Sequence, residues 1–134
     1  MTFSEACNYL SEVGLCAKDY INRQVDNSLS GGELKRIEIA TILARGTKVS
    51  VFDEPEAGID LWSFKNLIKV FEKMHKDIKG SIIIISHQER ILNIADELIV
   101  ISGGAVESVG TPEEILPQLL SDEKIECSCC KGDL

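Results

Sequence analysis

Residues 49–54 read Val-Ser-Val-Phe-Asp-Glu, an apolar run that ends in two adjacent carboxylates. Because Pro55 follows at once, Val49 to Phe52 is predicted to be a buried strand that ends in a loop. Ligands of α/β sheets bind beyond the carboxyl ends of the strands. Asp53 and Glu54 are therefore candidate site residues, although an isolated Asp-Glu pair is more often a pair of solvated loop carboxylates.

A second strand is predicted where the sequence has four consecutive isoleucines, Ile82 to Ile85. Such a β-branched run is too short for a helix and is typical of a strand covered on both faces, which implies a parallel sheet. Between the two strands, Asp60 can cap a long helix that Gly80 terminates. The predicted core face of this helix consists of Phe64, Leu67, Ile68, Phe71 and Met74.

Two helices are predicted before the first strand, each marked by capping-box spacing. The first begins after Thr2, with Glu5 at the reciprocal position, and a polar connection follows it. The second begins after Ser30, with Glu33 at the reciprocal position, and ends near Gly46.

The rest of the sequence predicts a short helix over residues 91–95, a hairpin and a last helix. Leu98 to Ile101 and Ala105 to Val109 flank Gly103-Gly104, which is typical of a hairpin. A threonine cap, a proline and two glutamates at 111–114 begin the last helix, which runs to about Leu120. This order of elements predicts the α/β class.

Length and composition are those of one soluble domain. The 134 residues are 44% hydrophobic and 27% charged, and no apolar run approaches the ~20 residues needed to cross a bilayer. No signal-peptide pattern follows Met1, so a cytoplasmic protein without membrane insertion is predicted. The net charge of -8 and the pI near 4.7 would repel phosphate backbones, which argues against nucleic-acid binding.

The five cysteines do not form the pattern of a secreted disulfide framework, so reduced thiols are expected. Cys7 and Cys16 lie near the N-terminus. Cys127, Cys129 and Cys130 lack the paired C-x-x-C spacing of a structural zinc site, and a solvated tail is expected there in preference to a soft-metal site.

The first segment with candidate chemistry is Leu29-Ser30-Gly31-Gly32-Glu33. Its two glycines allow a polyanion to approach the backbone, and the helix that follows offers free N–H groups at its positive end. The alternative is that Ser30 and Glu33 only cap a helix, and this segment alone leaves the choice open.

Three further segments carry candidate chemistry. Asp53 would hold Mg²⁺ through its water shell, while Glu54 would orient and deprotonate the water that attacks a γ-phosphate. Ala57-Gly58-Ile59-Asp60 is a turn in which Asp60 can act as a helix N-cap. His87 lies at the tip of the isoleucine strand, where it can donate to a γ-phosphate oxygen, although a lone histidine there is more often a satisfied loop residue.

In this order, LSGGE at 29–33, DEPEAGID at 53–60 and IIIISH at 82–87 resemble the ATP-binding-cassette (ABC) ATPases over roughly residues 20–114. The resemblance implies the C-terminal part of a P-loop NTPase fold, with ATP and Mg²⁺ as cofactors. It also implies specific roles: the signature loop for Leu29, Ser30, Gly31, Gly32 and Glu33, the Walker B pair for Asp53 and Glu54, the D-loop for Ala57 to Asp60, and the switch histidine for His87. The signature and Asp60 would then contact nucleotide, in composite sites that two protomers share.

Residues 21–25 (INRQV), 30–38 (SGGELKRIE) and 86–92 (SHQERIL) further resemble the SufC-type ATPase of iron–sulfur cluster assembly. Such a role implies iron–sulfur scaffold proteins as partners. Pro55 departs from that pattern and is similar to transporter ATPases, and the cysteine tail departs from it as well. An ABC transporter ATP-binding subunit is therefore the alternative.

No G-x-x-x-x-G-K-[ST] occurs in the sequence, and only 28 residues precede the signature. We expect a piece of a longer ATPase: residues 1–46 would be the remnant of a helical subdomain with the signature helix, residues 47–120 half of the catalytic core, and residues 121–134 an acidic, cysteine-containing tail. Because positioning supplies most of phosphoryl-transfer catalysis, the isolated chain is not expected to hydrolyse ATP.

Two classes of function remain open from the sequence. One is an ATPase completed by a missing N-terminal half or by a second protomer. The other is a non-hydrolysing interaction module. In either case, strands left without their usual cover favour a homo-oligomer.

Overall fold

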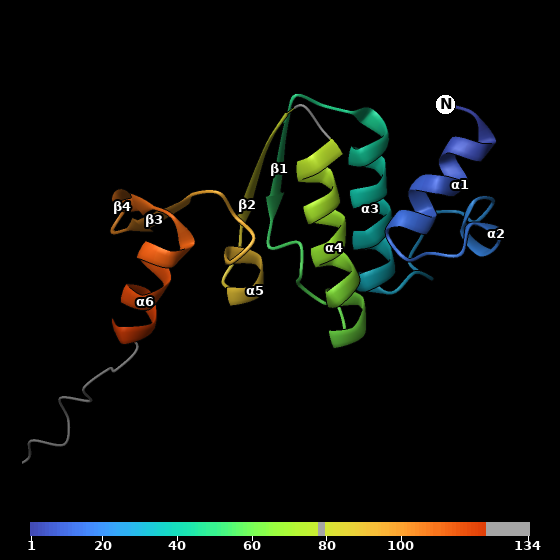
Figure 1. Ribbon diagram of the computed structural model, residues 1–134. Coiled ribbons are helices and arrows are strands. Elements are labelled where there is room, and N and C mark those ends of the chain that lie inside the picture. The colour runs from blue at the N-terminus through green and yellow to red at the C-terminus, as the bar shows by residue number, and fades with distance from the viewer. Residues whose placement is uncertain (78–79, 123–134) are drawn as a thin grey trace, which may run out of the picture. The chain divides into compact units, whose positions relative to one another are not determined.

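The computed structural model describes residues 1–77 and 80–122 (Figure 1). The chain forms two compact units, residues 1–87 and residues 88–134, and each is described by itself. The predicted boundaries at 46/47 and 120/121 stay a prediction. All the predicted site residues lie in the first unit.

The first unit contains a parallel pair of strands, β1 (Val49–Asp53) and β2 (Ser81–Ile85). Val49 pairs with Ser81 and Asp53 with Ile85, so both strands end at the same edge of the sheet. Helix α4 (Leu61–Asp77) connects them. Figure 1 shows α4 beside helix α3 (Gly31–Arg45), next to β1, with helix α1 (Phe3–Glu12) beyond α3. The predicted α/β class with parallel strands and flanking helices is confirmed.

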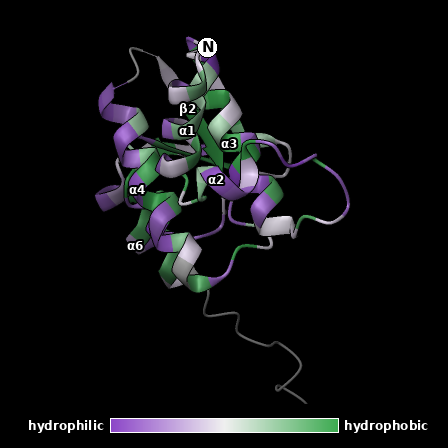
Figure 2. Ribbon diagram, turned by 90° about the vertical axis from the view of Figure 1, so that its right-hand side faces the viewer, coloured by the Kyte–Doolittle hydropathy of each residue, from purple (hydrophilic) through white to green (hydrophobic). Residues whose placement is uncertain are grey.

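The core of this unit lies between the helices and one face of the sheet. Phe52 of β1 meets Phe71 of α4 edge to face, with ring centroids 5.1 Å apart. Figure 2 shows hydrophobic and hydrophilic residues on different sides of α4. The buried apolar residues of the unit are Val13, Leu15, Ile39, Ala40, Phe52, Phe64, Leu67, Val70, Phe71 and Met74.

The opposite face of the sheet is exposed. Val49 and Val51 are each 57% exposed, and Ile83 and Ile85 are 52% and 51% exposed. Successive side chains of a strand point to opposite faces, and only one face meets α3 and α4. In the described residues the isoleucine strand is therefore not covered on both faces, and that expectation is wrong. The other expectation, of strands left without their usual cover, agrees with this exposed face.

Helix α4 also differs in detail from its prediction. Val70 joins the buried face, whereas Ile68 is only half-buried. The predicted stop at Gly80 follows residues 78–79, which lie outside the described part of the chain. A Cβ on Gly80 would lie 2.6 Å from the Lys48 carbonyl oxygen, so only glycine allows the chain to enter β2 at this point.

The helix caps follow the sequence closely. Thr2 and Glu5 form a complete capping box on α1, and Ser30 and Glu33 form one on α3. Gly46 ends α3 in the left-handed conformation, with φ of 56°. A short helix that was not predicted, α2 (Ala17–Tyr20), lies in the polar connection. It spans four residues and has no side-chain cap, so neither periodicity nor a cap could reveal it.

The second unit contains helix α5 (Glu89–Leu92), a hairpin of β3 (Leu98–Ser102) and β4 (Ala105–Gly110), and helix α6 (Pro112–Asp122). The predicted hairpin is confirmed, and Gly103 and Gly104 both adopt positive φ, as a type I′ turn requires. The core of this second unit consists of Leu98, Ile115 and Leu116. The predicted helix over 91–95 is wrong at both ends, since α5 begins at Glu89 and ends at Leu92.

Within residues 1–77 and 80–122, no helix is both long and apolar enough to span a membrane. Cys7 and Cys16 are free thiols, as expected. The predictions for Cys127, Cys129 and Cys130 concern residues outside the described part of the chain.

Candidate functional site

The ends of β1 and β2 bring Glu54 and His87 together. Because Asp53 pairs with Ile85, the residues that follow the two strands also meet. The Glu54 amide donates to the Ile85 carbonyl at 2.9 Å, and the Glu54 carboxylate lies 3.5 Å from His87 Nε2. Their side chains are 53% and 84% exposed, so both groups can reach a ligand.

Glu54 adopts an uncommon backbone conformation. Its φ is +43°, and among the described residues that are not glycine it alone has a positive φ. A non-glycine residue held there costs of order 1–3 kcal/mol, and such residues cluster at functional sites. The conformation turns the chain sharply after β1, and the Ala57 amide then donates to the Glu54 carbonyl at 3.0 Å.

Asp53 is the last residue of β1 and is exposed. Lys35 of α3 donates to its backbone carbonyl at 3.5 Å, which links the helix to the strand end and leaves the carboxylate outside this contact. Carboxylate oxygens are ligands that Mg²⁺ prefers, so the donor chemistry at this strand end fits the ion.

Ser30 and Glu33 cap α3, as the structural alternative predicted. Glu33 N–H donates to Ser30 Oγ at 3.2 Å, and Ser30 N–H donates to Glu33 Oε2 at 2.7 Å. Capping does not exclude the anion site, because the glycines Gly31 and Gly32 and the first helical turn stay at the N-terminus of a 15-residue helix.

Residues 29–33 and residues 57–60 lie side by side. A Cβ on Gly32 would lie 3.3 Å from the Gly58 carbonyl oxygen. Asp60 accepts hydrogen bonds from Ser63 N–H at 3.0 Å and from Ser63 Oγ at 2.7 Å, so its predicted N-cap role on α4 is confirmed. A side chain larger than hydrogen at position 32 would press against the neighbouring loop.

Two residues that were not candidates from the sequence contact Glu33. Tyr20 donates its hydroxyl hydrogen to Glu33 Oε1, and Arg23 Nη1 lies 3.8 Å from the same oxygen. Arg23 also lies over the Tyr20 ring and donates to the Ser28 carbonyl at 3.1 Å. The hydrogen bond from Tyr20, followed by those from Ser30, lowers the pKa of Glu33 to about 2.

We predict that Tyr20→Phe raises the pKa of Glu33 toward its ordinary value of 4.5, although the bonds from Ser30 keep it below that value. A depressed carboxyl pKa stabilises the fold above the ordinary pKa, and this stabilisation is lost as the pH falls through the folded-state pKa. As the pH falls, the variant should therefore lose the stabilisation from Glu33 at a higher pH than the parent chain does. Carbon-13 NMR titration of the Glu33 carboxyl measures the shift, and Tyr9→Phe on α1 is the control. An unchanged Glu33 pKa would contradict the assignment.

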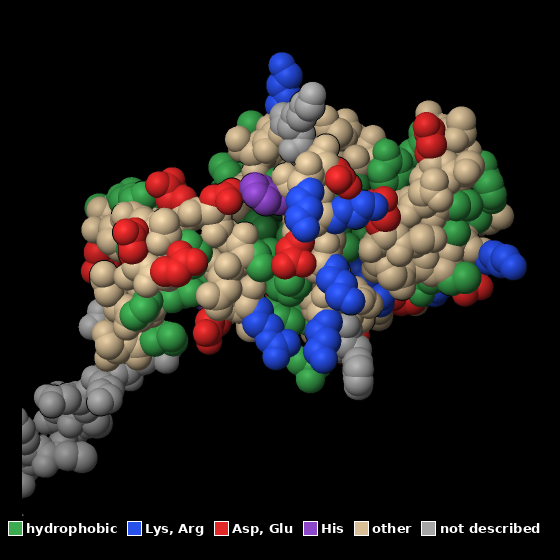
Figure 3. Space-filling view, viewed as in Figure 1, with side chains coloured by type: hydrophobic (Ala, Val, Ile, Leu, Met, Phe, Trp, Pro, Cys, Tyr) green, Lys and Arg blue, Asp and Glu red, His purple; other side chains and the backbone are tan. Residues whose placement is uncertain are grey.

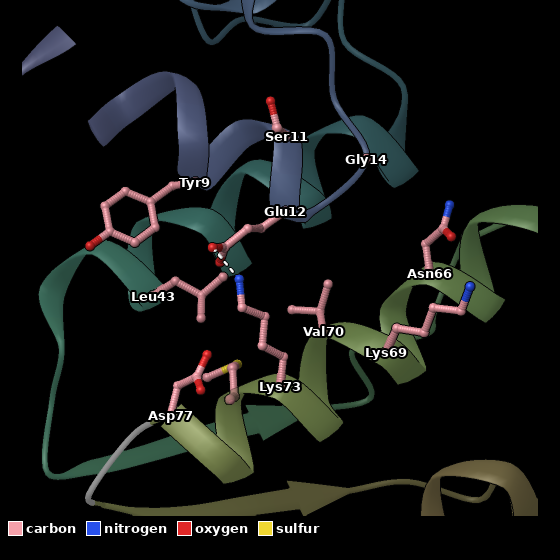
Figure 4. Close-up of a pocket in the computed structure, with 11 residues that line it drawn as sticks. Tyr9, Ser11, Glu12, Gly14, Leu43, Asn66, Lys69, Val70, Lys73 and Asp77 are labelled. Atoms are coloured by element: carbon pink, nitrogen blue, oxygen red, sulfur yellow. Dashed lines mark hydrogen bonds and ion pairs between the residues drawn. The ribbon is translucent and has the colours of Figure 1, made fainter. Parts of the chain in front are cut away.

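A pocket elsewhere in the unit, between α1, α3 and α4, contains none of the predicted site residues (Figure 4). Lys73 Nζ and Glu12 Oε1 form an ion pair 2.6 Å apart within it. Figure 3 shows basic side chains gathered over the middle of the viewed face, where α3 and α4 lie. Because Lys73 of α4 is paired with Glu12 of α1, the pocket is partly a packing contact between helices.

Comparison with known proteins supports the fold and the order of motifs. Residues 2–57 match the family model described as ABC transporter. An uncharacterized ABC transporter ATP-binding protein of Methanocaldococcus jannaschii is 40% identical over 79% of this chain and 42% of its own length. The energy-coupling factor transporter ATP-binding protein EcfA2 of Latilactobacillus sakei is 35% identical over 72% of this chain and 34% of its own length.

Among solved structures, cbiO1 from Clostridium perfringens, part of the ABC transporter complex cbiONQ, matches with a TM-score of 0.68 and 28% identity. The match covers 91% of this chain and 48% of that one. The chain thus spans less than half the length of each of these relatives. Their names are those of transporter proteins and give no support to the SufC-type resemblance. In its fold and in its family match, the chain is similar to part of the ATP-binding proteins of ABC transporters.

Proposed function

We propose that this chain supplies the signature, the catalytic glutamate and the switch histidine to the ATP-binding subunit of an ABC transporter. The observation that carries the proposal is the contact between Glu54 and His87 at the joined ends of β1 and β2. Ligands of α/β folds bind at this edge of the sheet.

Each candidate residue has a defined task in ATP hydrolysis. Glu54 would orient the attacking water and accept its proton. His87, which lies 3.5 Å from the Glu54 carboxylate, would donate to a phosphate oxygen. Asp53 would hold Mg²⁺ through water. When bound, this ion neutralises charge on the phosphates.

The signature residues act on a nucleotide held by another part of the assembly. Leu29 to Glu33 contains no lysine, and no P-loop occurs in the 134 residues, so the phosphates need a second segment. Ser30 and the glycines beside it would approach the γ-phosphate of a partner protomer, and Asp60 would lie at the same junction. A membrane-embedded transporter component is the further partner.

The transporter role is favoured over iron–sulfur assembly by two observations. The relatives named above are ATP-binding proteins of transporters, and Pro55, which departs from the SufC-type pattern, is buried directly after Glu54. Iron–sulfur scaffold proteins are therefore not proposed as partners.

The test joins this chain to an N-terminal segment that carries a P-loop. The joined protein should hydrolyse Mg-ATP, whereas the 134-residue chain alone should not. Ser30→Arg should lower turnover by about a hundredfold, since it places bulk and charge against the partner's nucleotide. Asn27→Arg, at an exposed position in the loop before the signature, is the matched control and should retain turnover.

Other outcomes would contradict the proposal. A joined protein that binds Mg-ATP and never hydrolyses it would support the interaction module. An unchanged rate in Ser30→Arg would remove the signature assignment, and calorimetric titration of each variant separates lost binding from lost turnover.

A further inference from the structure

Glu56 connects the two strand ends through its side chain. Its Oε1 accepts a hydrogen bond from Ser86 Oγ, and Ser86 directly precedes His87. The two residues are 30 positions apart in the chain, and both are half-buried. Neither was a candidate from the sequence, because a glutamate in a turn and a serine after a strand are common surface residues.

This contact adds to a backbone link between the same two segments. The Glu54 amide donates to the Ile85 carbonyl at 2.9 Å, one residue before Ser86. Glu56 is itself fixed, because Pro55 before it is fully buried and the Ile59 amide donates to the Glu56 carbonyl at 3.1 Å. The turn after β1 thus holds two successive residues, the last of β2 and the one that follows it.

The second oxygen of Glu56 shows that the side chain is not in a simple surface position. Oε2 is buried and has no hydrogen-bond partner within the described part of the chain. Leaving a buried acceptor unsatisfied costs about 1–3 kcal/mol. A shorter side chain or a solvated one would avoid this cost, so the bond to Ser86 is kept at the expense of stability.

We propose that Glu56 is a positioning residue that holds Ser86, and through it His87, against Glu54. Without this bond the exposed imidazole would have one restraint fewer, and its 3.5 Å approach to the Glu54 carboxylate should be weakened. The importance of this pair for ATP hydrolysis rests on the proposed function. The coupling itself can be measured on this chain without nucleotide.

Carbon-13 NMR of the histidine rings provides the test. The chain contains two histidines, and His75 on α4 serves as an internal reference for His87. At one fixed pH, Glu54→Gln should shift the His87 ring resonances and leave those of His75 in place. In the Glu56→Ala background, the same substitution should shift His87 by less than half as much.

Two variants separate positioning from general damage to the fold. Glu56→Gln retains an acceptor oxygen, so in this background Glu54→Gln should shift the His87 resonances as much as in the parent chain. In the Ser86→Ala background the shift should be reduced, as it is with Glu56→Ala. If Glu56→Ala fails to fold, Ser86→Ala decides. Full coupling between Glu54 and His87 in a folded variant that lacks the bond would overturn the proposal.

Kinetics of the joined protein keep this inference distinct from the proposed function. There, Glu56→Ala should lower kcat for ATP about tenfold and leave KM nearly unchanged, since the residue acts through His87 and not on the nucleotide. A joined protein without ATPase activity would contradict the proposed function, while the NMR coupling would still test the role of Glu56.

Discussion

Glu54→Gln in the joined protein is expected to reduce ATP turnover by about 10²–10⁴-fold while Mg-ATP binding is retained, since general-base catalysis contributes about this much. The amide has nearly the same shape as the carboxylate but cannot accept the proton of the attacking water. Asp53, which is proposed to hold the ion, is unchanged. Turnover at saturating ATP and calorimetric titration of the same sample measure the two quantities.

The control for this prediction is Glu38→Gln, an exposed glutamate on α3 that changes the net charge equally. Turnover of this variant should match the parent protein. If Glu54→Gln instead abolishes Mg-ATP binding, Glu54 is a ligand of the ion. If turnover is unchanged, another group is the base, and the contact with His87 has a structural role only.

The capping residues could be predicted from the sequence because their signals are local. Thr2 with Glu5 and Ser30 with Glu33 act within one helical turn, so spacing alone predicted both boxes. Glu54 and His87 could each be predicted as candidates, because each follows a predicted strand of a parallel sheet. That β1 and β2 are direct neighbours, which brings the two side chains together, could not be predicted from the sequence.

The groups that support the site could not be predicted, because their partners are distant in the chain. Tyr20 reaches Glu33 across 13 positions and Glu56 reaches Ser86 across 30. No periodicity or motif links such pairs, and each residue by itself is an ordinary polar side chain. The exposed sheet face, in contrast, was expected, because a piece of a longer ATPase leaves strands without their usual cover. The apolar run alone shows only that a strand can be covered, not that a covering element is present.

That exposed face leads to the second large expected effect. In solution at micromolar concentration, the chain should form a dimer or a higher oligomer. Val49, Val51, Ile83 and Ile85 form one apolar surface on adjacent strands, and each is more than half exposed. Removing such surface from water contributes about 25 cal/mol per Å². In the described part of the chain each of the two strands also has one hydrogen-bonded neighbour, so its outer edge can pair with another copy.

The variant that tests this association is Val51→Lys combined with Ile83→Glu. These residues are direct partners in the register, so the new charges can attract each other across the strands and preserve the sheet. Taking them out of water at an interface is unfavourable, and the dissociation constant should rise by about a hundredfold. Phe3→Lys, at a 66% exposed position on α1, is the control and should associate as the parent chain does.

Light scattering measures the mass of each protein, and a urea series reports whether unfolding is cooperative. A parent chain that is a monodisperse monomer and unfolds in one step would contradict the prediction, because residues 1–134 would then form a self-sufficient core with an apolar face that tolerates water.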